Sequence, residues 1–597
     1  MNRDILYDKI YACWAGKNIG GTLGAPVEGC MDALDLTFFP EIPDGQALPN
    51  DDLDLQLVNL HAAEQYGVAL TTEQIGREWL EHVRFQFDEY GYAQTALRCG
   101  FIPPFSGKWD NPFVNCMGSP IRSEIWACAA PGRPDIAAYF AWQDAAVDHA
   151  GGEGVFGEIF NAAIEALAFV WAGSLVELVE KALSFIPAAC RTAKAVREAL
   201  DCYAAGLSLA ETREKILAGH GSPNFTDAPQ NIAFTVAGVL WGRDFEDVLL
   251  KTVNLGYDTD CTVATAGALW GILYGRASIP AKWSAPVGDG IVLSAAVRGF
   301  APPPTLDDLT RRTILLGDKL ALEDPARFVM PESEQVDFSV QRYTLPAEAD
   351  RRFSFCVELR YGDDRPSIGP GSPVELRFTF INNATDRWAV VPTLELPCGL
   401  SCAAEASEIV LMPGERAEWV ATVVSNGRIA AVNSCRLKLA RINDFALWNE
   451  FTVNFPILRA STWIVDGKLI EVDGTLVRFT QRGGDDGHEA YAVLDVPFTR
   501  ETKIICSSQA AIGVNLDDKI IISSSYHSHD MPAYHRAHAD QCAVMTIPAG
   551  RHLIKVTAFE DDDHPEYCIP SFRFCTVRGG KATEPGSCYR YIDTVVE

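Results

Sequence analysis

Apolar residues recur with the period of an α-helix over roughly the first 330 residues of the chain. Leu6, Ile10 and Trp14 follow one another at intervals of four, so they form one face of a predicted amphipathic helix. Residues 156–170 are apolar on almost every side and predict a buried central helix, and residues 306–322 predict the last helix of this region. Strand-like alternation is nearly absent here. The pattern therefore predicts an all-α domain over residues 1–332.

The pattern changes to alternating apolar and polar residues after this region. Residues 374–380 read Val-Glu-Leu-Arg-Phe-Thr-Phe, which is the strict alternation of a half-buried antiparallel strand. Similar runs occur at residues 417–423 and 451–455. We expect these strands to form an immunoglobulin-like β-sandwich over residues 333–460.

Short strands separated by turns rich in Gly and Asp follow, at residues 475–479, 503–506 and 519–522. They predict a second β-sandwich, similar to a jelly roll, over residues 461–597. Residues 527–538 in this region gather four of the eleven histidines, an arrangement that suits either a ligand site or a solvated loop. The predicted fold is multidomain, with an all-α N-terminal domain followed by two β-sandwich domains.

Composition and charge narrow the range of partners. The chain has 597 residues, 48% of them hydrophobic, so it can bury several cores. Its formal net charge of −29 repels phosphate backbones and anionic lipid, so we expect no nucleic-acid partner and no membrane partner. A small-molecule or sugar-containing substrate is the expected partner. The composition leaves the oligomeric state open, and a homo-oligomer is compatible with it.

The cysteines and the amino terminus indicate the compartment. The 17 cysteines are odd in number and follow no metal-finger spacing or repeating framework, which disfavours a disulfide scaffold. Asp4 and Asp8 lie where a secretory signal needs basic and then apolar residues, and no run of about 18 apolar residues occurs. We therefore expect a cytoplasmic protein.

Two acidic clusters lie where predicted helices begin. Residues 50–54 read Asn-Asp-Asp-Leu-Asp, and residues 256–262 read Gly-Tyr-Asp-Thr-Asp-Cys-Thr. Carboxylates at this density repel one another unless a cation neutralises them or water solvates them, so two such clusters favour a site for a hard metal ion. Helix capping by Asp would explain either cluster alone, and it explains the two together less well.

Glycines mark a third segment of interest, residues 20–28, which read Gly-Gly-Thr-Leu-Gly-Ala-Pro-Val-Glu. Gly16, Gly20 and Gly24 recur every four residues, and Gly267 and Gly271 repeat that spacing after the second acidic cluster. Glycines at such positions allow close approach of two helices, so we expect most of them to serve helix packing.

These three segments together resemble the ADP-ribosylglycohydrolase family over roughly residues 5–330. That family carries a glycine-rich turn ending in Glu, a Thr-Asp-Asp-Thr element, and a Gly-x-Asp-Thr-Asp-Thr element before a helix of small residues. Residues 118–122, 144–149 and 229–231 resemble three further elements of the family less closely.

The resemblance implies an all-α fold with a binuclear magnesium site that cleaves a glycosidic bond at C1 of a ribose. It implies one or two Mg²⁺ ions, with Mn²⁺ as an alternative. The implied metal ligands are Asn50, Asp51, Asp52, Asp258, Asp260 and Thr262. The implied catalytic residues are Glu28, Asp52 and Asp258. The implied substrate-binding residues are Gly118, Ser119, Arg122, His149 and Asn231.

Four positions depart from the family pattern. Asn50, Leu53 and Cys261 replace Thr, and Gly21 replaces the Asp of the first element. A thiol is a soft ligand that suits Mg²⁺ badly, so Cys261 either weakens one metal position or yields its place as ligand to Thr262. These departures put the second ion in question.

Three functions are consistent with the sequence. The leading one is a Mg-dependent glycohydrolase that cleaves an N- or O-glycosidic bond at a ribosyl, including an ADP-ribosyl, group. A second is a glycoside hydrolase for a non-nucleotide carbohydrate, with the β-domains as accessory modules. A third is a weakly catalytic nucleotide- or glycan-binding protein, because the family's Thr is lost at three positions. Trp463 and Tyr534 are aromatic residues that suit either sugar stacking or a β-domain core.

Overall fold

The computed structural model describes residues 1–331, 336–347, 349–404, 407–442, 447–479, 487–559, 570–578 and 595–596. The chain divides into two compact units. The first comprises Met1–Phe85 and Pro112–Val336, and the second comprises Gln86–Asn111 and Asp337–Glu597. The predicted junction at residues 332 and 333 lies outside the described residues. The division groups residues 86–111, which precede that junction, with the β-strands.

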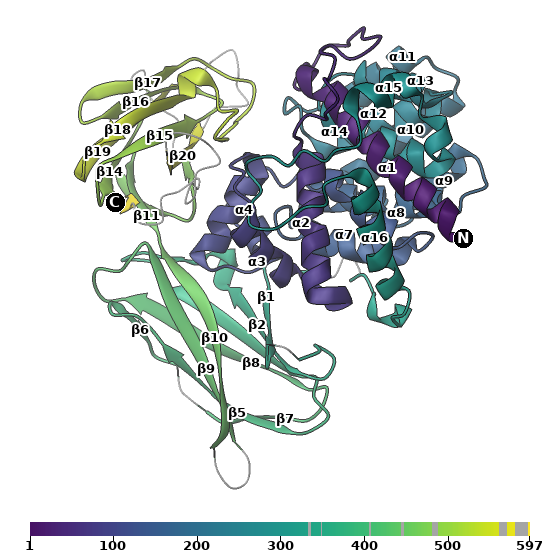
Figure 1. The fold of residues 1–597 in the computed structure, drawn as a ribbon. Helices are drawn as coiled ribbons and strands as arrows, with labels where there is room; N and C mark the ends of the chain where they lie inside the picture. The colour runs from purple at the N-terminus through teal and green to yellow at the C-terminus, as the bar shows by residue number, and fades with distance from the viewer. Residues whose placement is uncertain are drawn as a thin grey trace. The chain divides into compact units, whose positions relative to one another are not determined.

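The first unit is helical, as its apolar periodicity predicts (Figure 1). The predicted central helix is α8, whose residues are almost all buried, and the predicted last helix is α16. No helix among the described residues combines the length and apolar character that a membrane span requires. The helices of this unit are α1 (Arg3–Gly24), α2 (Asp51–Tyr66), α3 (Thr72–His82), α6 (Glu124–Ala129), α7 (Pro134–Ala145), α8 (Glu153–Ala168), α9 (Leu175–Leu183), α10 (Arg191–Ala204), α11 (Leu209–His220), α12 (Ala228–Trp241), α13 (Phe245–Val253), α14 (Thr259–Tyr274), α15 (Ala281–Val287) and α16 (Leu306–Leu320).

Helices α1 and α14 pack together with their backbones in direct contact (Figure 1). A Cβ atom added to Gly16 would lie 2.1 Å from the carbonyl oxygen of Gly267, and one added to Gly20 would lie 2.3 Å from that of Val263. Such distances are far shorter than van der Waals contact, so only glycine fits at these positions. The four-residue glycine spacing therefore serves helix packing, as predicted.

The second unit contains two β-sandwiches, each with its own hydrophobic core. In the first sandwich one sheet has the strand order β1-β2-β4-β8-β6 and the other β3-β10-β9-β5-β7. The side chains of β4 alternate between more and less buried positions, which confirms the strand predicted at residues 374–380. The strands are β1 (Gln341–Leu345), β2 (Phe355–Tyr361), β3 (Ser367–Ile368), β4 (Val374–Asn382), β5 (Trp388–Glu395), β6 (Leu400–Cys402), β7 (Ile409–Leu411), β8 (Arg416–Ser425), β9 (Val432–Ile442) and β10 (Leu447–Arg459).

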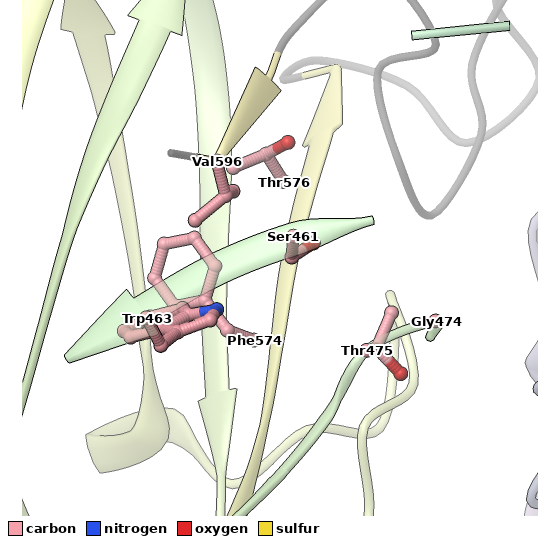
Figure 2. A pocket seen from close by; sticks show the side chains of 7 residues that line it. All are labelled: Ser461, Trp463, Gly474, Thr475, Phe574, Thr576 and Val596. Carbon is pink, nitrogen blue, oxygen red and sulfur yellow. The ribbon is translucent and has the colours of Figure 1, made fainter. Parts of the chain in front are cut away.

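The second sandwich has one sheet ordered β12-β11-β14-β19-β16-β17, with β21 beside β14, and another ordered β13-β20-β15-β18. Its core includes Trp463, which lies edge-on against Phe572 and Phe574. Trp463 is thus a core residue, and it borders a small pocket (Figure 2). The strands are β11 (Ser461–Val465), β12 (Lys468–Val472), β13 (Leu476–Arg478), β14 (His488–Val496), β15 (Arg500–Ser507), β16 (Ala511–Leu516), β17 (Lys519–Ser524), β18 (Cys542–Ile547), β19 (Gly550–Phe559), β20 (Ser571–Arg578) and β21 (Val595–Val596).

Two helices, α4 (Asp88–Cys99) and α5 (Phe105–Lys108), belong to the second unit. Phe101, Phe105 and Trp109 are buried in the core of the first sandwich. Asp110, which follows this segment, accepts a hydrogen bond from Arg573 of the second sandwich at 2.9 Å. The helical periodicity of residues 86–111 is therefore local, and their aromatic residues decide which core they join.

Replacing Gly20 with Ala should destabilise the helical unit by about 3 kcal/mol or more, because the new methyl group would overlap the backbone at Val263. The free energy of unfolding, measured in urea by the helical circular-dichroism signal, tests this. Gly219→Ala is the matched control. Gly219 lies in helix α11 with no atom within 4 Å of the added Cβ, so its replacement should stabilise the unit by up to about 1 kcal/mol. Equal stability of the two variants would contradict the packing role.

Candidate metal-binding site

The two acidic clusters lie at the N-termini of helices α2 and α14. At α2 the Asn50 side chain caps the helix, because its Oδ1 accepts a hydrogen bond from the Asp52 backbone N–H at 2.7 Å. At α14 Asp258 occupies the N-cap position, but its side chain makes no capping hydrogen bond. Capping therefore accounts for Asn50 and does not account for the Asp258 carboxylate.

Backbone contacts join the glycine-rich turn to the start of α14. The Tyr257 N–H donates to the Cys30 carbonyl at 2.7 Å, and the Gly29 N–H donates to the Tyr257 carbonyl at 2.9 Å. The Thr259 hydroxyl donates to the carbonyl of Gly24 at 2.9 Å. These bonds hold the turn against the second acidic cluster, so the Glu28 side chain reaches the carboxylates at the start of α14.

The carboxylates and the Cys261 thiol form two groups of potential metal ligands, here called donor groups, and both contain Asp260. Glu28, Asp258 and Asp260 form one group, and Asp52, Asp260 and Cys261 form the other. Within each group the donor atoms lie within 4.8 Å of one another. Three segments that are distant in sequence thus converge on one place.

Asp260 lies at the centre of this negative charge. Its side chain is only 6% exposed, and its Oδ1 accepts no hydrogen bond from any described residue. Burial raises the pKa of Asp260 well above its ordinary value, and the charges of Glu28, Asp258, Asp52 and Asp51 raise it further. A divalent cation would relieve this repulsion, and oxygen donors are what Mg²⁺ prefers. The residues of the first donor group fit such an ion.

Lys17 of helix α1 supplies a cation to the second donor group. Its Nζ lies 3.0 Å from Asp52 Oδ1 and 2.9 Å from Glu124 Oε1, and it donates to the carbonyl of Ile121 at 2.9 Å. Lys17 is 1% exposed. Burial would lower the pKa of Lys17, but the two carboxylates outweigh burial and raise this pKa above its ordinary value. Sequence reasoning missed Lys17, although a lysine within the apolar stretch 10–23 is a detectable signal.

Cys261 lies in the second donor group as a protonated thiol. Burial raises the pKa of Cys261 well above its ordinary value, and the charges of Asp258 and Asp260 add to that rise. The thiol is hydrogen-bonded to Asp52. Thr262 is fully buried and its hydroxyl donates to the carbonyl of Thr259 at 3.3 Å, so it serves the helix in this structure.

The Asn50 side chain fills the space beside Gly21. A Cβ atom added to Gly21 would lie 2.5 Å from Asn50 Nδ2. The Asp that the first family element carries at this position would therefore clash with Asn50. The two departures from the family pattern thus occur at residues in contact with each other.

Arg122 and His149 lie in a buried ionic network. Arg122 is 0% exposed, and its guanidinium donates to Asp148 at 2.8 and 2.9 Å and to Asp144 at 3.2 Å. His149 Nδ1 lies 3.0 Å from Asp148. The Gly118 carbonyl accepts another guanidinium N–H at 2.9 Å. The predicted substrate-binding side chains of Arg122 and His149 thus lie in the interior of the helical unit.

Ser119 and Asn231 are also buried. The Ser119 carbonyl accepts a hydrogen bond from the Arg122 backbone N–H at 3.0 Å. The Asn231 Nδ2 donates to the carbonyl of Asp227 at 2.9 Å, while its Oδ1 accepts from the Asp258 backbone N–H at 3.2 Å. Asn231 therefore positions the start of α14, and its role toward a substrate stays a prediction.

Asp148 should make stability depend on acid pH. Although burial raises its pKa, Arg122 and His149 hold the pKa of Asp148 at about 2, below its ordinary value of 3.8. The ionised carboxylate therefore adds about 2 kcal/mol to the free energy of unfolding. This contribution is present above about pH 4 and is lost as the pH falls toward 2. Asp148→Asn should flatten the fall in unfolding free energy between pH 4 and 2.

The control for this measurement is Asp135→Asn, which alters an exposed acidic residue in the first turn of α7. Its stability profile should match that of the unaltered protein. The Asp148→Asn substitution should also lower the free energy of unfolding at neutral pH by about 3–5 kcal/mol, because Arg122 is left with less compensating charge. An unchanged acid profile in Asp148→Asn would contradict the assignment.

Comparison with known proteins places these residues in a family. The family model described as ADP-ribosylglycohydrolase matches residues 2–316, which is more than half of the chain. Among curated protein sequences, none is significantly similar to this chain.

Solved structures give weaker similarities. An ADP-ribosylglycohydrolase-related protein complex is 19% identical, with 53% of this chain and 99% of that chain covered and a TM-score of 0.35. The secreted serine protease VesC from Vibrio cholerae is 9% identical, with 36% and 49% covered and a TM-score of 0.15. An α-L-rhamnosidase from Aspergillus terreus is 9% identical, with 39% and 27% covered and a TM-score of 0.14.

Proposed function

Because the chain belongs to the ADP-ribosylglycohydrolase family, we propose that it is a Mg²⁺-dependent glycohydrolase that cleaves an N- or O-glycosidic bond at a ribosyl group. The observation that carries this proposal is the convergence of Glu28, Asp258 and Asp260 within 4.8 Å of one another. Asp260 is buried against the other carboxylates, and a divalent cation fits the charge and the oxygen donors of this group.

The side chains of the site have different roles in the proposed hydrolysis. Asp258 and Asp260 would hold the ion, and a bound Mg²⁺ would supply the polarisation of a water molecule and the orientation of sugar hydroxyls. Glu28 is the exposed member of the group, so its carboxylate is placed to exchange a proton with water or with the leaving group. The remaining negative charge favours the oxocarbenium-like character that develops at the anomeric carbon. Asn231 holds the backbone of Asp258 in place.

Asp52 has a different role from Asp258 in this proposal. Burial raises the pKa of Asp52, and the Lys17 ammonium opposes that rise. The ion pair fixes the Asp52 carboxylate beside Asp260, so Asp52 positions the site and stays out of proton transfer. The Lys17 ammonium already compensates negative charge in the second donor group, and the Cys261 thiol is a poor ligand for Mg²⁺. We propose that the site takes one ion tightly.

Asp260→Asn should abolish tight Mg²⁺ binding and reduce hydrolysis by at least about 1,000-fold, because it removes the carboxylate shared by both donor groups. Glu28→Gln should weaken Mg²⁺ binding less than Asp260→Asn does, because Asp258 and Asp260 remain as donors, and it should lose at least about 100-fold in rate, because it removes the proton-transfer group. Calorimetric Mg²⁺ titration and product release measure the two effects separately. Asp135→Asn is the control and should change neither. Full activity of Asp260→Asn in chelator would overturn the proposal.

Lys17→Met should raise the number of tightly bound Mg²⁺ ions from one to two, because it frees Asp52 and Glu124 from their cation. Without Mg²⁺ the variant should be less stable by about 3–5 kcal/mol, and excess Mg²⁺ should restore part of that loss. Equilibrium dialysis measures the stoichiometry. The control is Lys251→Met, which removes a partly exposed ion pair with Asp247. One bound ion in both variants would contradict the role of Lys17.

A second candidate is the hydrolysis of a non-nucleotide glycoside. Arg122, the basic residue predicted to face the substrate, is fully buried and already bound to Asp144 and Asp148, so it offers no charge to a pyrophosphate. This observation favours a substrate without phosphate groups.

Calorimetric titration with ADP-ribose, in Mg²⁺ and in chelator, separates the two substrate classes. Micromolar binding that requires Mg²⁺ supports the ADP-ribosyl substrate. Absence of binding, together with turnover of one member of an aryl-glycoside panel, supports the plain glycoside. Binding of a nucleotide or glycan without any single-turnover product would instead support a binding protein.

A further inference from the structure

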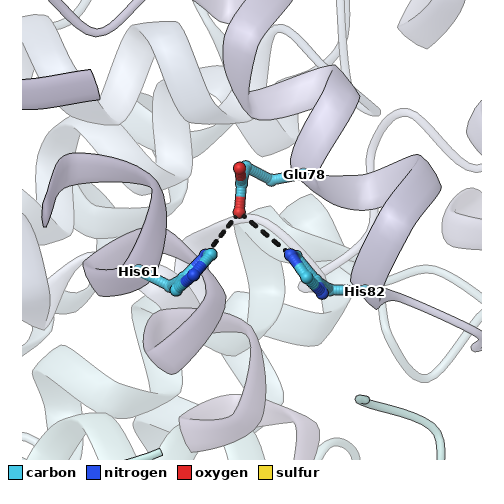
Figure 3. A group of neighbouring side chains, drawn as sticks. All are labelled: His61, Glu78 and His82. Atoms are coloured by element: carbon cyan, nitrogen blue, oxygen red, sulfur yellow. Dashed lines mark hydrogen bonds and ion pairs between the residues drawn. The ribbon is translucent and has the colours of Figure 1, made fainter. Parts of the chain in front are cut away.

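Two histidines and a glutamate meet between helices α2 and α3, outside the acidic site (Figure 3). His61 comes from the second half of α2. Glu78 and His82 come from α3, where a separation of four residues places them on the same helix face. The donor atoms of the three side chains lie within 4.8 Å of one another.

The distances suit ligands around a single small ion. His82 Nε2 lies 3.4 Å from Glu78 Oε2, and His61 Nδ1 lies 2.6 Å from the same oxygen. Ligands at the Zn–N and Zn–O distances of a tetrahedral zinc site lie roughly 3.3 Å apart. The His82–Glu78 separation already has this value. The His61–Glu78 separation reaches it if the two side chains open by less than about 1 Å.

Neighbouring groups orient the histidine and the carboxylate. His82 Nδ1 donates to the carbonyl of Arg298 at 2.7 Å, because a carbonyl can only accept. In the tautomer that carries its proton on Nδ1, His82 presents the lone pair of Nε2 toward Glu78 (Figure 3). Tyr66 is hydrogen-bonded to the Glu78 carboxylate. Such bonds to the far side of each ligand are typical of metal sites.

An aromatic ring covers the cluster on another side. The ring of Phe300 stacks on His61 at 4.8 Å between centroids and lies edge-on to His82 at 5.2 Å. The His61 side chain is 23% exposed, whereas that of Glu78 is 1% exposed. The cluster is therefore closed on most sides and reachable by solvent at His61.

The buried Glu78 carboxylate lies between the two imidazoles. Among the described residues, the ion pairs of this buried carboxylate are with the two imidazoles. Two imidazole nitrogens and one carboxylate oxygen are ligands that suit Zn²⁺ and suit Mg²⁺ poorly. Ligands of this kind differ from the oxygen donors of Glu28, Asp258 and Asp260, so these two groups favour different metals.

We propose that His61, Glu78 and His82 form a second metal site, which binds Zn²⁺ or a similar borderline divalent ion with a water molecule as the fourth ligand. The ion joins α2 to α3 through its ligands. Since α2 begins at the acidic cluster, the zinc site holds in place the helix that carries Asp51 and Asp52. This site does not depend on the proposed glycohydrolase activity.

The test is a Zn²⁺ titration of the full chain, stripped of metal and held in excess Mg²⁺, with a chromophoric chelator as competitor. The unaltered protein should bind one more tight Zn²⁺ than Glu78→Gln or His82→Asn, each of which should weaken this site by at least about 100-fold. His552→Asn is the matched control, since it removes an imidazole that also pairs with one carboxylate, Asp517, and it should bind as the unaltered protein does.

Two further measurements, the absorption spectrum with Co²⁺ and the Tm with Zn²⁺, test the same proposal. Co²⁺ in place of Zn²⁺ should give the visible absorption of a tetrahedral site in the unaltered protein and not in Glu78→Gln. Zn²⁺ should raise the Tm of the unaltered protein and leave that of Glu78→Gln unchanged. Glu78→Gln preserves the shape of the side chain, so circular dichroism without metal shows whether it folds. Equal Zn²⁺ stoichiometry and affinity in the unaltered protein and Glu78→Gln would overturn the proposal, as would a failure of the unaltered protein to bind Zn²⁺ tightly.

Discussion

The contact between the backbones of helices α1 and α14 is the constraint on which the candidate site depends. Glycine at positions 16, 20 and 24 lets α1 approach α14 so closely that any Cβ atom there would overlap the facing main chain. The same contact brings the turn after α1 to the start of α14, where Thr259 bonds to the Gly24 carbonyl. Glu28 reaches Asp258 and Asp260 because the helices can touch. The packing of small residues thus determines the geometry of the charged ones.

Buried charge is the second organising factor of the helical unit. The protein compensates its interior carboxylates in different ways at neighbouring places: Lys17 neutralises Asp52 and Glu124, and Arg122 neutralises Asp144 and Asp148. Asp260 has carboxylates around it and a protonated thiol beside it. An external cation is needed only where the chain supplies none of its own. This contrast within one unit explains why a metal site is expected around Asp260 and a structural network around Arg122.

The predicted site residues fall into two groups, which differ in how the protein compensates their charge. Glu28, Asp52, Asp258 and Asp260 are brought together, and the charge of Asp51 also acts on Asp260. Arg122, His149 and Asn231 lie near these helices but are buried and bind protein groups. Residue type cannot distinguish an arginine that faces a substrate from one that balances interior carboxylates, because both need the same charge. Only the exposure and partners of the side chain separate the two roles. The role of Lys17 is not evident from the sequence because Asp52 and Glu124 are distant along the chain, and the Glu78–His82 pair of α3 becomes a cluster only when packing adds His61 of α2.

The sequence by itself determined the elements: the helical period of the first region, the alternation of the β-strands, the acidic helix starts and the glycine spacing all appear in the structure. These features are local, since each depends on residues a few positions apart. Tertiary structure decided which elements share a core, as for residues 86–111, whose aromatic side chains join a β-sandwich. It also decided which charges meet and which are compensated within the protein. Those outcomes depend on packing and on the free energy of burying charge, which act between residues hundreds of positions apart.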